Sequence, residues 1–296
     1  MIMAKIYGGL GNQLFQYAAG YAIAKGSGTP LMLDVSAGLA RDAHNRVYCL
    51  QHYNLSATVA TAEQVQAFLA NKKTLLTQSK YLHNKLGLAL KKNYWHQHYI
   101  YQNTYDNAFA KAKCDDVYLE GFWQNENLFI AYKQALLQEL TITAPLNDIN
   151  AHYTKLIHNT HSVALHIRRG DALRATAQLI YNMPSMAYYN AAVQHLVHLE
   201  PHITLYIFSD DIAWCKQHVQ YNLPTHYMDI NDDDTNYADL YLMQQCKYII
   251  TANSTFSWWG AWLSTINDRV VITPKLWFHI PKWNNSNLIP KHWIKL

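Results

Sequence analysis

The stretch 162–171, SVALHIRRGD, runs from four small or apolar residues directly into a dense polar cluster. Apolar residues in such a short run predict a buried β-strand over 162–168. Because side chains alternate along a strand, we expect His166 and Arg168 to share one face and Arg169 to point to the other. A polar cluster directly after a buried strand is typical of the ligand-binding edge of a parallel sheet.

Beyond this strand, short apolar runs alternate with segments of helical periodicity. The pattern predicts further strands at 203–208, 225–229, 248–251 and 269–273, and helices at 185–199, 212–219, 235–246 and 255–263. Five strands with helices between them indicate a doubly wound parallel sheet, that is, a Rossmann-like α/β domain. Ligands on such sheets bind outside the carboxyl ends of the strands.

The N-terminal half contains the same kind of pattern in a less regular form. We expect strands at 4–7, 30–35 and 117–120, a helix after the glycines at 8–11, a helix from the capping box of Thr61 and Gln64 to Ala70, and a helix at 125–140. The rest of 43–113 is predicted to be helical and rich in loops. Residues 141–148 show no periodicity and indicate a linker. The sequence therefore predicts two α/β domains, 1–145 and 146–296.

The composition narrows the classes of function. Half of the 296 residues are hydrophobic, which is enough for two domains that each bury a core. Charged residues make up 15%, against roughly 25% in an average globular protein, while Tyr, Trp, Asn, Gln and His are plentiful. Such a surface suits sugars, although the aromatic rings could also simply form the cores. The net charge of +4 comes without blocks of like charge, so no nucleic-acid partner is expected.

The sequence also indicates a location inside the cell. Its four cysteines, Cys49, Cys114, Cys215 and Cys246, form no CxxC pair and are typical of reduced thiols. The first residues show neither a signal-peptide pattern nor a long apolar segment. We expect a cytoplasmic protein, or one that docks peripherally on the inner membrane.

The polar cluster after the 162–168 strand suits a diphosphate. The planar fork of an arginine binds phosphate oxygens bidentately and stays charged, which makes Arg168 the expected contact. The alternative is a structural ion pair between Arg169 and Asp171.

A second cluster, TANSTFSWWG at 251–260, places hydroxyl and backbone N–H groups at a predicted helix N-terminus. Such a terminus favours an anion. Ordinary N-capping by Asn253 or Ser254 is the alternative, but it explains one polar residue rather than four in succession.

The turn GGLGNQ at 8–13 allows the backbone to approach a ligand, with Gly9, Asn12 and Gln13 as the expected contacts. It is not a dinucleotide fingerprint, because Leu14 stands where a third glycine is required. A tight turn capped by Asn12 is the alternative.

Carboxylates follow two further strands. Ser209, Asp210 and Asp211 could accept the N–H groups of a guanine edge, or Asp211 could cap the next helix. Asp232 and Asp234 match the Asp-x-Asp sequence motif that holds a metal in one class of sugar transferases. A solvated loop leading to a cap at Thr235 explains the same residues.

In amino-acid sequence, these clusters resemble the bacterial α-1,2-fucosyltransferases of glycosyltransferase family 11. The resemblance covers essentially the whole chain and rests on GGLGNQLFQYA at 8–18, YLEGFWQNE at 118–126, HIRRGD at 166–171, YIFSDDIAWC at 206–215 and NSTFSWWGAWL at 253–263. It implies a GT-B-type architecture, in which two Rossmann-like domains face a cleft, with the acceptor on the N-terminal domain and GDP-fucose on the C-terminal one. It also implies inverting, metal-independent transfer to the 2-hydroxyl of a terminal galactose-type acceptor, in surface glycan or O-antigen synthesis.

The resemblance also implies roles for particular residues. Arg168 matches the arginine that binds the donor diphosphate, with His166 and Asp171 beside it as further candidate catalytic residues. The donor cradle corresponds to Asn253, Ser254, Thr255, Phe256 and Ser257, and Asn12 and Gln13 are implied to face the donor. Ala172 departs from the family, which usually has Tyr there, so contacts beside the site are expected to differ.

The acceptor side is less defined. A general base could be Asp34, Glu120, Glu126 or Asp171, and a dissociative route that needs no strong base stays open. Trp123 and Gln124 could offer an aromatic platform and an amide to the acceptor sugar. Two competing functions remain: a metal-dependent sugar transferase that uses Asp232 and Asp234, and a non-catalytic carbohydrate-binding protein.

Overall fold

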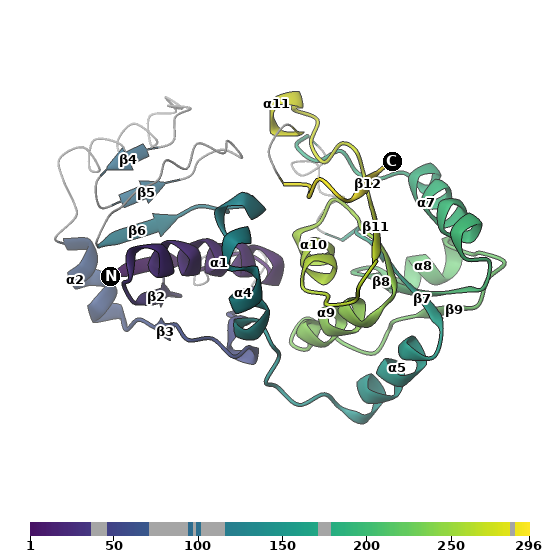
Figure 1. The fold of residues 1–296 in the computed structure, drawn as a ribbon, viewed down its shortest axis with the longest axis horizontal. Helices are drawn as coiled ribbons and strands as arrows, with labels where there is room; N and C mark the ends of the chain where they lie inside the picture. The colour runs from purple at the N-terminus through teal and green to yellow at the C-terminus, as the bar shows by residue number, and fades with distance from the viewer. Residues whose placement is uncertain (37–45, 71–93, 97–98, 102–115, 171–178, 285–287) are drawn as a thin grey trace. The chain divides into compact units, whose positions relative to one another are not determined.

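The computed structural model describes residues 1–36, 46–70, 94–96, 99–101, 116–170, 179–284 and 288–296 (Figure 1). The chain divides into two compact units. Unit 1 is Met1–Leu140 with Ser286–Leu288, and unit 2 is Thr141–Asn285 with Ile289–Leu296. In the described residues, each unit is built around its own β-sheet of six strands.

The sheet of unit 1 has the strand order β3-β2-β1-β6-β5-β4. Neighbouring strands are parallel, apart from the antiparallel pair β4–β5. The strands are β1 (Ile2–Lys5), β2 (Leu31–Asp34), β3 (Thr58–Val59), β4 (Tyr94–His96), β5 (Tyr99–Tyr101) and β6 (Val117–Glu120). The strands predicted at 30–35 and 117–120 are confirmed, and the one predicted at 4–7 lies two residues nearer the N-terminus.

Helix α1 (Leu10–Ser27) follows β1 and is buried on nearly all sides. Helix α2 (Ala62–Ala70) begins with the predicted capping box: Thr61 N–H donates to Gln64 Oε1 at 2.8 Å, and Gln64 N–H donates to Thr61 Oγ1 at 3.2 Å. A short 3-10 turn, η1 (Leu50–His52), lies between them in the chain.

The single helix predicted at 125–140 is wrong. The chain forms two 3-10 turns, η2 (Glu126–Leu128) and η3 (Ile130–Tyr132), before α4 (Lys133–Glu139). Phe129, between the turns, is fully buried and has φ −135°, which no α-helix accommodates. Its ring packs against Phe15 of α1 with centroids 6.0 Å apart, so a tertiary contact overrides the helical pattern.

Unit 2 contains the predicted doubly wound sheet, with the order β12-β11-β10-β7-β8-β9 and all neighbours parallel. The strands are β7 (His161–Ile167), β8 (Ile203–Ser209), β9 (Thr225–Tyr227), β10 (Tyr248–Ile250), β11 (Val270–Thr273) and β12 (Ile294–Lys295). The five predicted strands, β7 to β11, are confirmed, and β12 extends the sheet at one edge.

The helices of unit 2 form two layers: α5, α9 and α10 lie on one face of the sheet, and α7 and α8 on the other (Figure 1). Their bounds are α5 (Asp148–His158), α7 (Met186–Leu199), α8 (Ile212–His218), α9 (Asn236–Gln245), α10 (Thr255–Trp262) and a short α11 (Pro281–Asn284). Helix α5 was not predicted. Its residues Ile149, Tyr153, Leu156 and Ile157 recur at the spacing of one helix face, but the helix begins at Asp148, within the predicted linker 141–148.

Both sheets have their first strand in the interior with later strands on either side of it, but only the sheet of unit 2 reverses its strand order there. In unit 1 the chain passes from β1 to β2 and β3 on one side and returns to β6 on the other. In unit 2 it passes from β7 to β8 and β9 and then crosses to β10. Ligands bind at such topological switch points, outside the carboxyl ends of the strands. A site is therefore expected at the β7/β10 switch point, and the β1/β6 junction holds the glycine turn at the corresponding central position of the other sheet.

Candidate functional site

The β7/β10 switch point brings together residues that are far apart in the sequence. Leu165 pairs with Ile250, so the residues beyond each strand emerge side by side. We use the name carboxyl-edge site for His166, Arg168, Thr251, Asn253, Ser254 and Phe256. The imidazole of His166 lies 5.7 Å from the ring of Phe256, centroid to centroid, which joins β7 to the first turn of α10.

Three side-chain atoms of this site are buried without a hydrogen-bond partner in the described part of the chain: His166 Nδ1, Thr251 Oγ1 and Asn253 Oδ1. The three residues are 7%, 0% and 1% exposed. A buried polar atom left unpaired costs about 1–3 kcal/mol, so such atoms are rare unless a ligand or water completes them. Three of them beside one switch point indicate a site that binds something polar.

The ring of His166 is uncharged at neutral pH. Burial, together with the positive charge of Arg168, lowers its pKa from 6.5 to about 3. A neutral imidazole donates one hydrogen bond and accepts another, so it contacts a ligand without adding charge.

Helix α10 supplies the other side of the site. Ser254 is its N-cap, with Oγ accepting from Phe256 N–H at 3.3 Å, so the capping alternative is confirmed for Ser254. Asn253 does not cap: its Nδ2 donates to the backbone oxygens of Asn182 at 2.9 Å and Trp277 at 3.3 Å. Ser257 is fully buried and donates to Ser254 O at 3.4 Å. These contacts leave Asn253 Oδ1 without a partner among the described residues, while the half-buried Thr255 is the first residue of the helix.

The position of α10 is fixed by aromatic packing. Trp258 contacts Trp259, Trp262 and Trp293, with ring centroids 5.0 to 6.0 Å apart, and all four rings are buried. The tryptophans of the 251–260 cluster are therefore core residues that hold the helix N-terminus in place.

The two arginines after β7 have different surroundings, as strand alternation predicts. Arg168 is partly exposed, and its Cζ lies 5.6 Å from the centre of the Tyr181 ring. Arg169 Nε pairs with Asp211 Oδ2 at 3.2 Å, and its Cζ lies 3.6 Å from the centre of the Trp214 ring. The expected partner, Asp171, lies outside the described residues, as does Ala172. In the described part of the chain, Asp211 takes the structural role that was predicted for Asp171.

The carboxylates after β8 are engaged in local structure. Asp211 caps α8, with Oδ1 accepting from Trp214 N–H at 3.2 Å, which confirms the capping alternative. Ser209 Oγ accepts from Asp211 N–H at 3.0 Å, and Asp210 Oδ1 accepts from Arg169 N–H at 2.7 Å. A Cβ on Gly170 would lie 2.7 Å from Asp210 Oδ2, so only glycine fits beneath this carboxylate. Contacts of Ser209, Asp210 and Asp211 with guanine remain predictions.

At the β1/β6 junction of unit 1, the glycine turn is held by Gln13. Its Nε2 donates to Gly8 O and Val47 O, both at 2.8 Å, and its Oε1 accepts from Cys49 N–H at 2.9 Å. Gly8 has φ +78°, which glycine adopts without strain. Gln13 therefore has a structural function, and its contact with the donor remains a prediction.

Asn12 does not cap the turn, so that alternative is wrong. The N-cap of α1 is Gly9, which has no side-chain cap, and Asn12 Oδ1 accepts instead from Gln124 Nε2 at 2.9 Å. Sequence reasoning missed Arg46, whose Nη1 lies 3.4 Å from the position that a Cβ on Gly9 would take. No motif surrounds Arg46, so only the fold brings this cation to the glycine turn.

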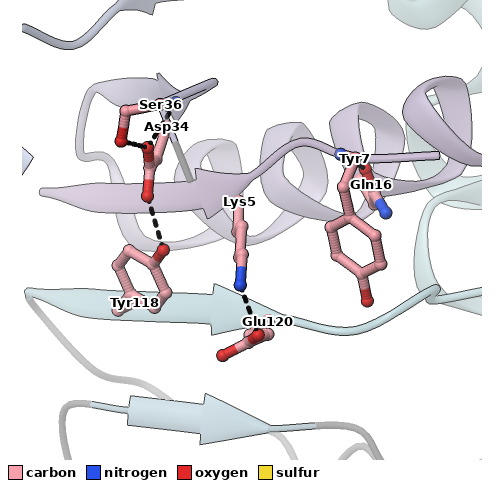
Figure 2. Close-up of polar contacts among 7 residues, drawn as sticks. All are labelled: Lys5, Tyr7, Gln16, Asp34, Ser36, Tyr118 and Glu120. Atoms are coloured by element: carbon pink, nitrogen blue, oxygen red, sulfur yellow. Dashed lines mark hydrogen bonds and ion pairs between the residues drawn. The ribbon is translucent and has the colours of Figure 1, made fainter. Parts of the chain in front are cut away.

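The acceptor-side carboxylates have partners within unit 1 (Figure 2). Asp34 is buried and accepts from the Tyr118 hydroxyl at 2.6 Å, and from Ser36 N–H and Oγ–H at 2.9 and 2.6 Å. Glu120 Oε1 pairs with Lys5 Nζ at 2.6 Å. The Lys5–Glu120 pair joins the neighbouring strands β1 and β6, whereas the Tyr118–Asp34 bond joins β6 to β2 across β1, so each carboxylate also ties the sheet together (Figure 2).

Trp123 is not an exposed platform in this structure. It is 3% exposed and has φ +53°, a left-handed conformation that is uncommon for a bulky residue. Gln124 is buried and bonded to Asn12, while Glu126 is half-buried at the start of η2. The ring of Trp123 therefore belongs to the core, and contacts of Gln124 and Glu126 with an acceptor remain predictions.

The Asp-x-Asp sequence at 232–234 forms a turn that is closed by hydrogen bonds to Asp232. Asp232 Oδ1 accepts from Asp234 N–H, Thr235 N–H and Thr235 Oγ1–H at 3.1, 3.0 and 2.7 Å. These hydrogen bonds lower the pKa of Asp232. Among the residues that the structure describes, no three His, Cys, Asp or Glu side chains lie together as metal ligands would. The geometry favours the loop interpretation of Asp232 and Asp234.

None of the helices in the described ranges has both the length and the apolar character needed to cross a membrane.

Comparison with known proteins identifies relatives along the whole chain. It is 31% identical to an Escherichia coli α-1,2-colitosyltransferase, over 100% of this chain and 99% of that protein. It is also 31% identical to the Escherichia coli O-antigen biosynthesis glycosyltransferase WbnK, over 98% of both. A Bos taurus galactoside 2-α-L-fucosyltransferase, SEC1, is 21% identical over 63% of this chain and 56% of its own length.

The solved structure of an Arabidopsis thaliana FUT1 mutant in complex with GDP matches with a TM-score of 0.51 and 10% identity, over 91% of this chain and 69% of that one. At this identity the likeness shows the fold, which is the GT-B type with its two Rossmann-like sheets. The family model for glycosyl transferase family 11 matches residues 1–296. The chain therefore belongs to glycosyl transferase family 11.

Proposed function

We propose that this glycosyltransferase is a galactoside α-1,2-fucosyltransferase. It transfers L-fucose from GDP-fucose to the 2-hydroxyl of a terminal galactose-type acceptor, with inversion at the anomeric carbon and without a metal. Family membership, the α-1,2 linkage in the name of one E. coli relative and the name of the bovine relative support this assignment. The E. coli O-antigen relative supports a role in surface glycan synthesis, with an acceptor that is free or lipid-linked and a cytoplasmic or peripheral inner-membrane location.

One observation carries the donor assignment: the carboxyl-edge site contains three buried polar atoms that have no partner among the described residues, together with the cation Arg168 and the N-terminus of α10. A nucleotide diphosphate supplies what such a site lacks. Its phosphate oxygens accept hydrogen bonds from a guanidinium and from the first N–H groups of a helix. Its ribose hydroxyls and base N–H groups offer donors to the oxygens of Thr251 and Asn253.

The chemistry follows from these groups. The acceptor 2-oxygen forms a bond to the anomeric carbon as the bond from that carbon to the β-phosphate oxygen breaks, and GDP departs with an added negative charge. Arg168 and the N–H groups at the start of α10 stabilise that charge from fixed positions, which is the largest contribution the described residues make. Neutral His166 hydrogen-bonds the donor and leaves the positive field to Arg168.

The proton of the acceptor hydroxyl must also leave. Asp34 already accepts three hydrogen bonds, and Glu120 is paired with Lys5, so each would have to give up a partner to act as a base. Glu126 and Asp171 remain the other candidate bases, and a dissociative route, in which GDP departure runs ahead of proton transfer and a weak base is sufficient, needs none of the four to be strongly basic.

The donor test sets GDP-L-fucose against GDP-colitose, because colitose is 3-deoxy-L-fucose and one relative is a colitosyltransferase. Each donor is incubated with a panel of β-galactosides in EDTA, and the linkage of the product is determined by NMR. We expect an α-1,2-fucosylated product. Transfer of colitose alone would reassign the donor and keep the reaction class.

The same assay separates the competing functions. A metal-dependent transferase would be inactive in EDTA and recover with Mn²⁺ or Mg²⁺. A carbohydrate-binding protein would bind the galactosides and show no affinity for GDP by calorimetry. Either result would contradict the proposed function.

A further inference from the structure

The chain between β7 and α7 returns to the carboxyl-edge site as one edge of a two-stranded ribbon. Tyr181 forms an antiparallel bridge with Phe278. On either side of it, Asn182 N–H donates to Trp277 O and His279 N–H donates to Ile180 O, both at 3.0 Å. We call residues 180–182 and 277–279 the edge ribbon.

Two side-chain amides hold the edge ribbon. Asn253 Nδ2 donates to Asn182 O and Trp277 O, one oxygen on each half of the ribbon. Asn284 Oδ1 accepts from Trp277 N–H at 2.7 Å and Phe278 N–H at 3.0 Å, and its Nδ2 donates to Phe278 O at 2.6 Å. Trp277 and Phe278 are buried, so the 277–279 half is fixed to the body of unit 2.

This ribbon places an aromatic ring under Arg168. The ring of Tyr181 packs on Phe278 with centroids 5.5 Å apart and an interplanar angle of 37°. Arg168 Cζ lies 5.6 Å from the centre of the same Tyr181 ring, within the range of a cation–π contact. Tyr181 therefore stands between a fixed core ring and the guanidinium that is proposed to meet the donor diphosphate.

We infer that Tyr181 is a positioning residue for Arg168, and that Asn253 couples this position to the donor cradle. Asn253 uses its NH₂ group to hold the ribbon and leaves Oδ1 unpartnered for a ligand. A ligand that hydrogen-bonds Asn253 Oδ1 also fixes the side-chain amide of Asn253. That amide holds the edge ribbon, the ribbon holds the Tyr181 ring, and the ring holds the guanidinium of Arg168. The inference rests on the proposed role of Arg168 in donor binding.

An arginine side chain has several rotatable bonds, and a preorganised fork loses less entropy when it binds phosphate. Removal of the ring should therefore weaken transition-state stabilisation more than ground-state binding. A contact of this kind contributes roughly five- to thirty-fold in an equilibrium or rate, depending on how well it is shielded from water. The hydroxyl of Tyr181 contributes no part of this effect.

The test compares Tyr181→Leu with Tyr181→Phe. The Leu variant should lose roughly five- to thirty-fold in single-turnover rate at saturating donor, with a smaller change in GDP affinity by calorimetry. The Phe variant keeps the ring and should restore both values. Tyr221→Leu, which removes a half-buried tyrosine bonded to Asn190, is the matched control and should leave the rate unchanged.

Two further measurements separate positioning from a structural effect. In an Arg168→Lys background, Tyr181→Leu should cause little further loss of rate, because the two changes remove the same interaction between the guanidinium and the ring. In the free protein, the Arg168 Nε–Hε NMR signal should lose its ring-current shift in Tyr181→Leu and keep it in Tyr181→Phe. This signal needs no GDP, so it tests the contact even if wild-type protein fails to bind GDP and the proposed function falls.

Three results would each overturn the inference. They are equal losses of rate in the Leu and Phe variants, additive losses in the Arg168→Lys background, and an Arg168 NMR signal that does not change when Tyr181 is replaced by Leu. A lower melting temperature in Tyr181→Leu with an unchanged rate would mean that the ring serves only stability.

Discussion

Both units have their first strand inside a six-stranded sheet, but they differ in strand order and in how the polar groups beside that strand are satisfied. In unit 1 the groups around β1/β6 bond to one another: Gln124 to Asn12, Lys5 to Glu120 and Tyr118 to Asp34. In unit 2 the groups around β7/β10 include three buried atoms without partners in the described residues. A buried unpaired polar atom is costly, so unit 2 carries a cost that a bound ligand can remove.

The contrast is one of degree. Gln16 Nε2, near the end of β1, is also buried without a partner among the described residues, although its Oε1 accepts from Tyr7 N–H at 2.9 Å. The concentration of such atoms still differs between the two edges. The edge of unit 2 is therefore expected to change most when a ligand binds, because more of the polar groups at the edge of unit 1 already have partners.

The largest expected effect concerns Trp123 in unit 1. If its ring is core rather than platform, Trp123→Ala should lower the free energy of unfolding by about 3–5 kcal/mol. Chemical denaturation measures this, and KM values for donor and acceptor are compared on the remaining folded protein. A rise in acceptor KM at unchanged stability would return Trp123 to the acceptor site and weaken the contrast between the units.

The next effect concerns chemistry in unit 2. Arg168→Lys keeps the charge and loses the planar fork, so kcat should fall by about two orders of magnitude while GDP affinity falls only moderately. Single-turnover kinetics and calorimetry measure the two.

Arg169→Lys is the matched control for Arg168→Lys. It loses the contacts with Asp211 and Trp214 and should lower stability by about 1 kcal/mol, with a near-normal rate. A catalytically inactive Arg169→Lys beside an active Arg168→Lys would reverse the assignment of the two faces of β7.

Ligand binding should separate the two edges directly. GDP at a hundred times its Kd should stabilise the protein by about 2.7 kcal/mol in EDTA, seen as a rise in melting temperature. Hydrogen exchange in the same samples should show new protection after β7 and β10 and little change after β1 and β6. If stabilisation appeared only with Mn²⁺ or Mg²⁺, the metal-free proposal would fail.

His166 should make unit 2 sensitive to acid. Its pKa is about 3 in the folded protein and 6.5 when exposed. Between pH 6.5 and pH 3 the unfolded chain is therefore protonated at His166 and the folded chain is not, so a fall in pH favours unfolding. The associated stability is complete above pH 6.5 and is lost as pH falls toward 3, by about 2 kcal/mol between pH 7 and pH 5. His166→Gln should remove this part of the pH dependence in denaturation curves recorded at both pH values. An unchanged slope would mean that His166 titrates normally.

The smallest effect concerns the hydrogen bond between Asn12 and Gln124. A double-mutant cycle with Asn12→Ala and Gln124→Ala should give a coupling energy of about 1 kcal/mol in stability, with GDP affinity within twofold of wild type. A large loss of GDP affinity in Asn12→Ala alone would instead support the predicted contact of Asn12 with the donor.

Much of unit 2 could be predicted because its signals are local. Strands β7 to β11 follow from short apolar runs between helical segments, and the capping of α8 and α10 follows from Asp211 and Ser254 before each helix. The position of His166 and Arg168 at a strand end follows from the same reasoning. Helix α5 was missed although its apolar residues recur at helical spacing, because it begins at Asp148, inside the segment predicted to be a linker. The helix predicted at 125–140 is broken because Phe129 is held by a residue in α1.

By itself, the sequence determined most strands and helices of unit 2, three strands of unit 1 and which polar residues stand at strand ends, because these depend on alternation, periodicity and capping within a few residues. Only the tertiary structure decided which of those residues are partnered. Gln13 reaches Val47 and Cys49, Arg169 reaches Asp211, and Asn253 reaches Asn182 and Trp277 across gaps of 24 to 71 residues. Such contacts form only when the sheet brings distant strand ends together, so no local pattern distinguishes a side chain that serves the framework from one that a ligand must complete.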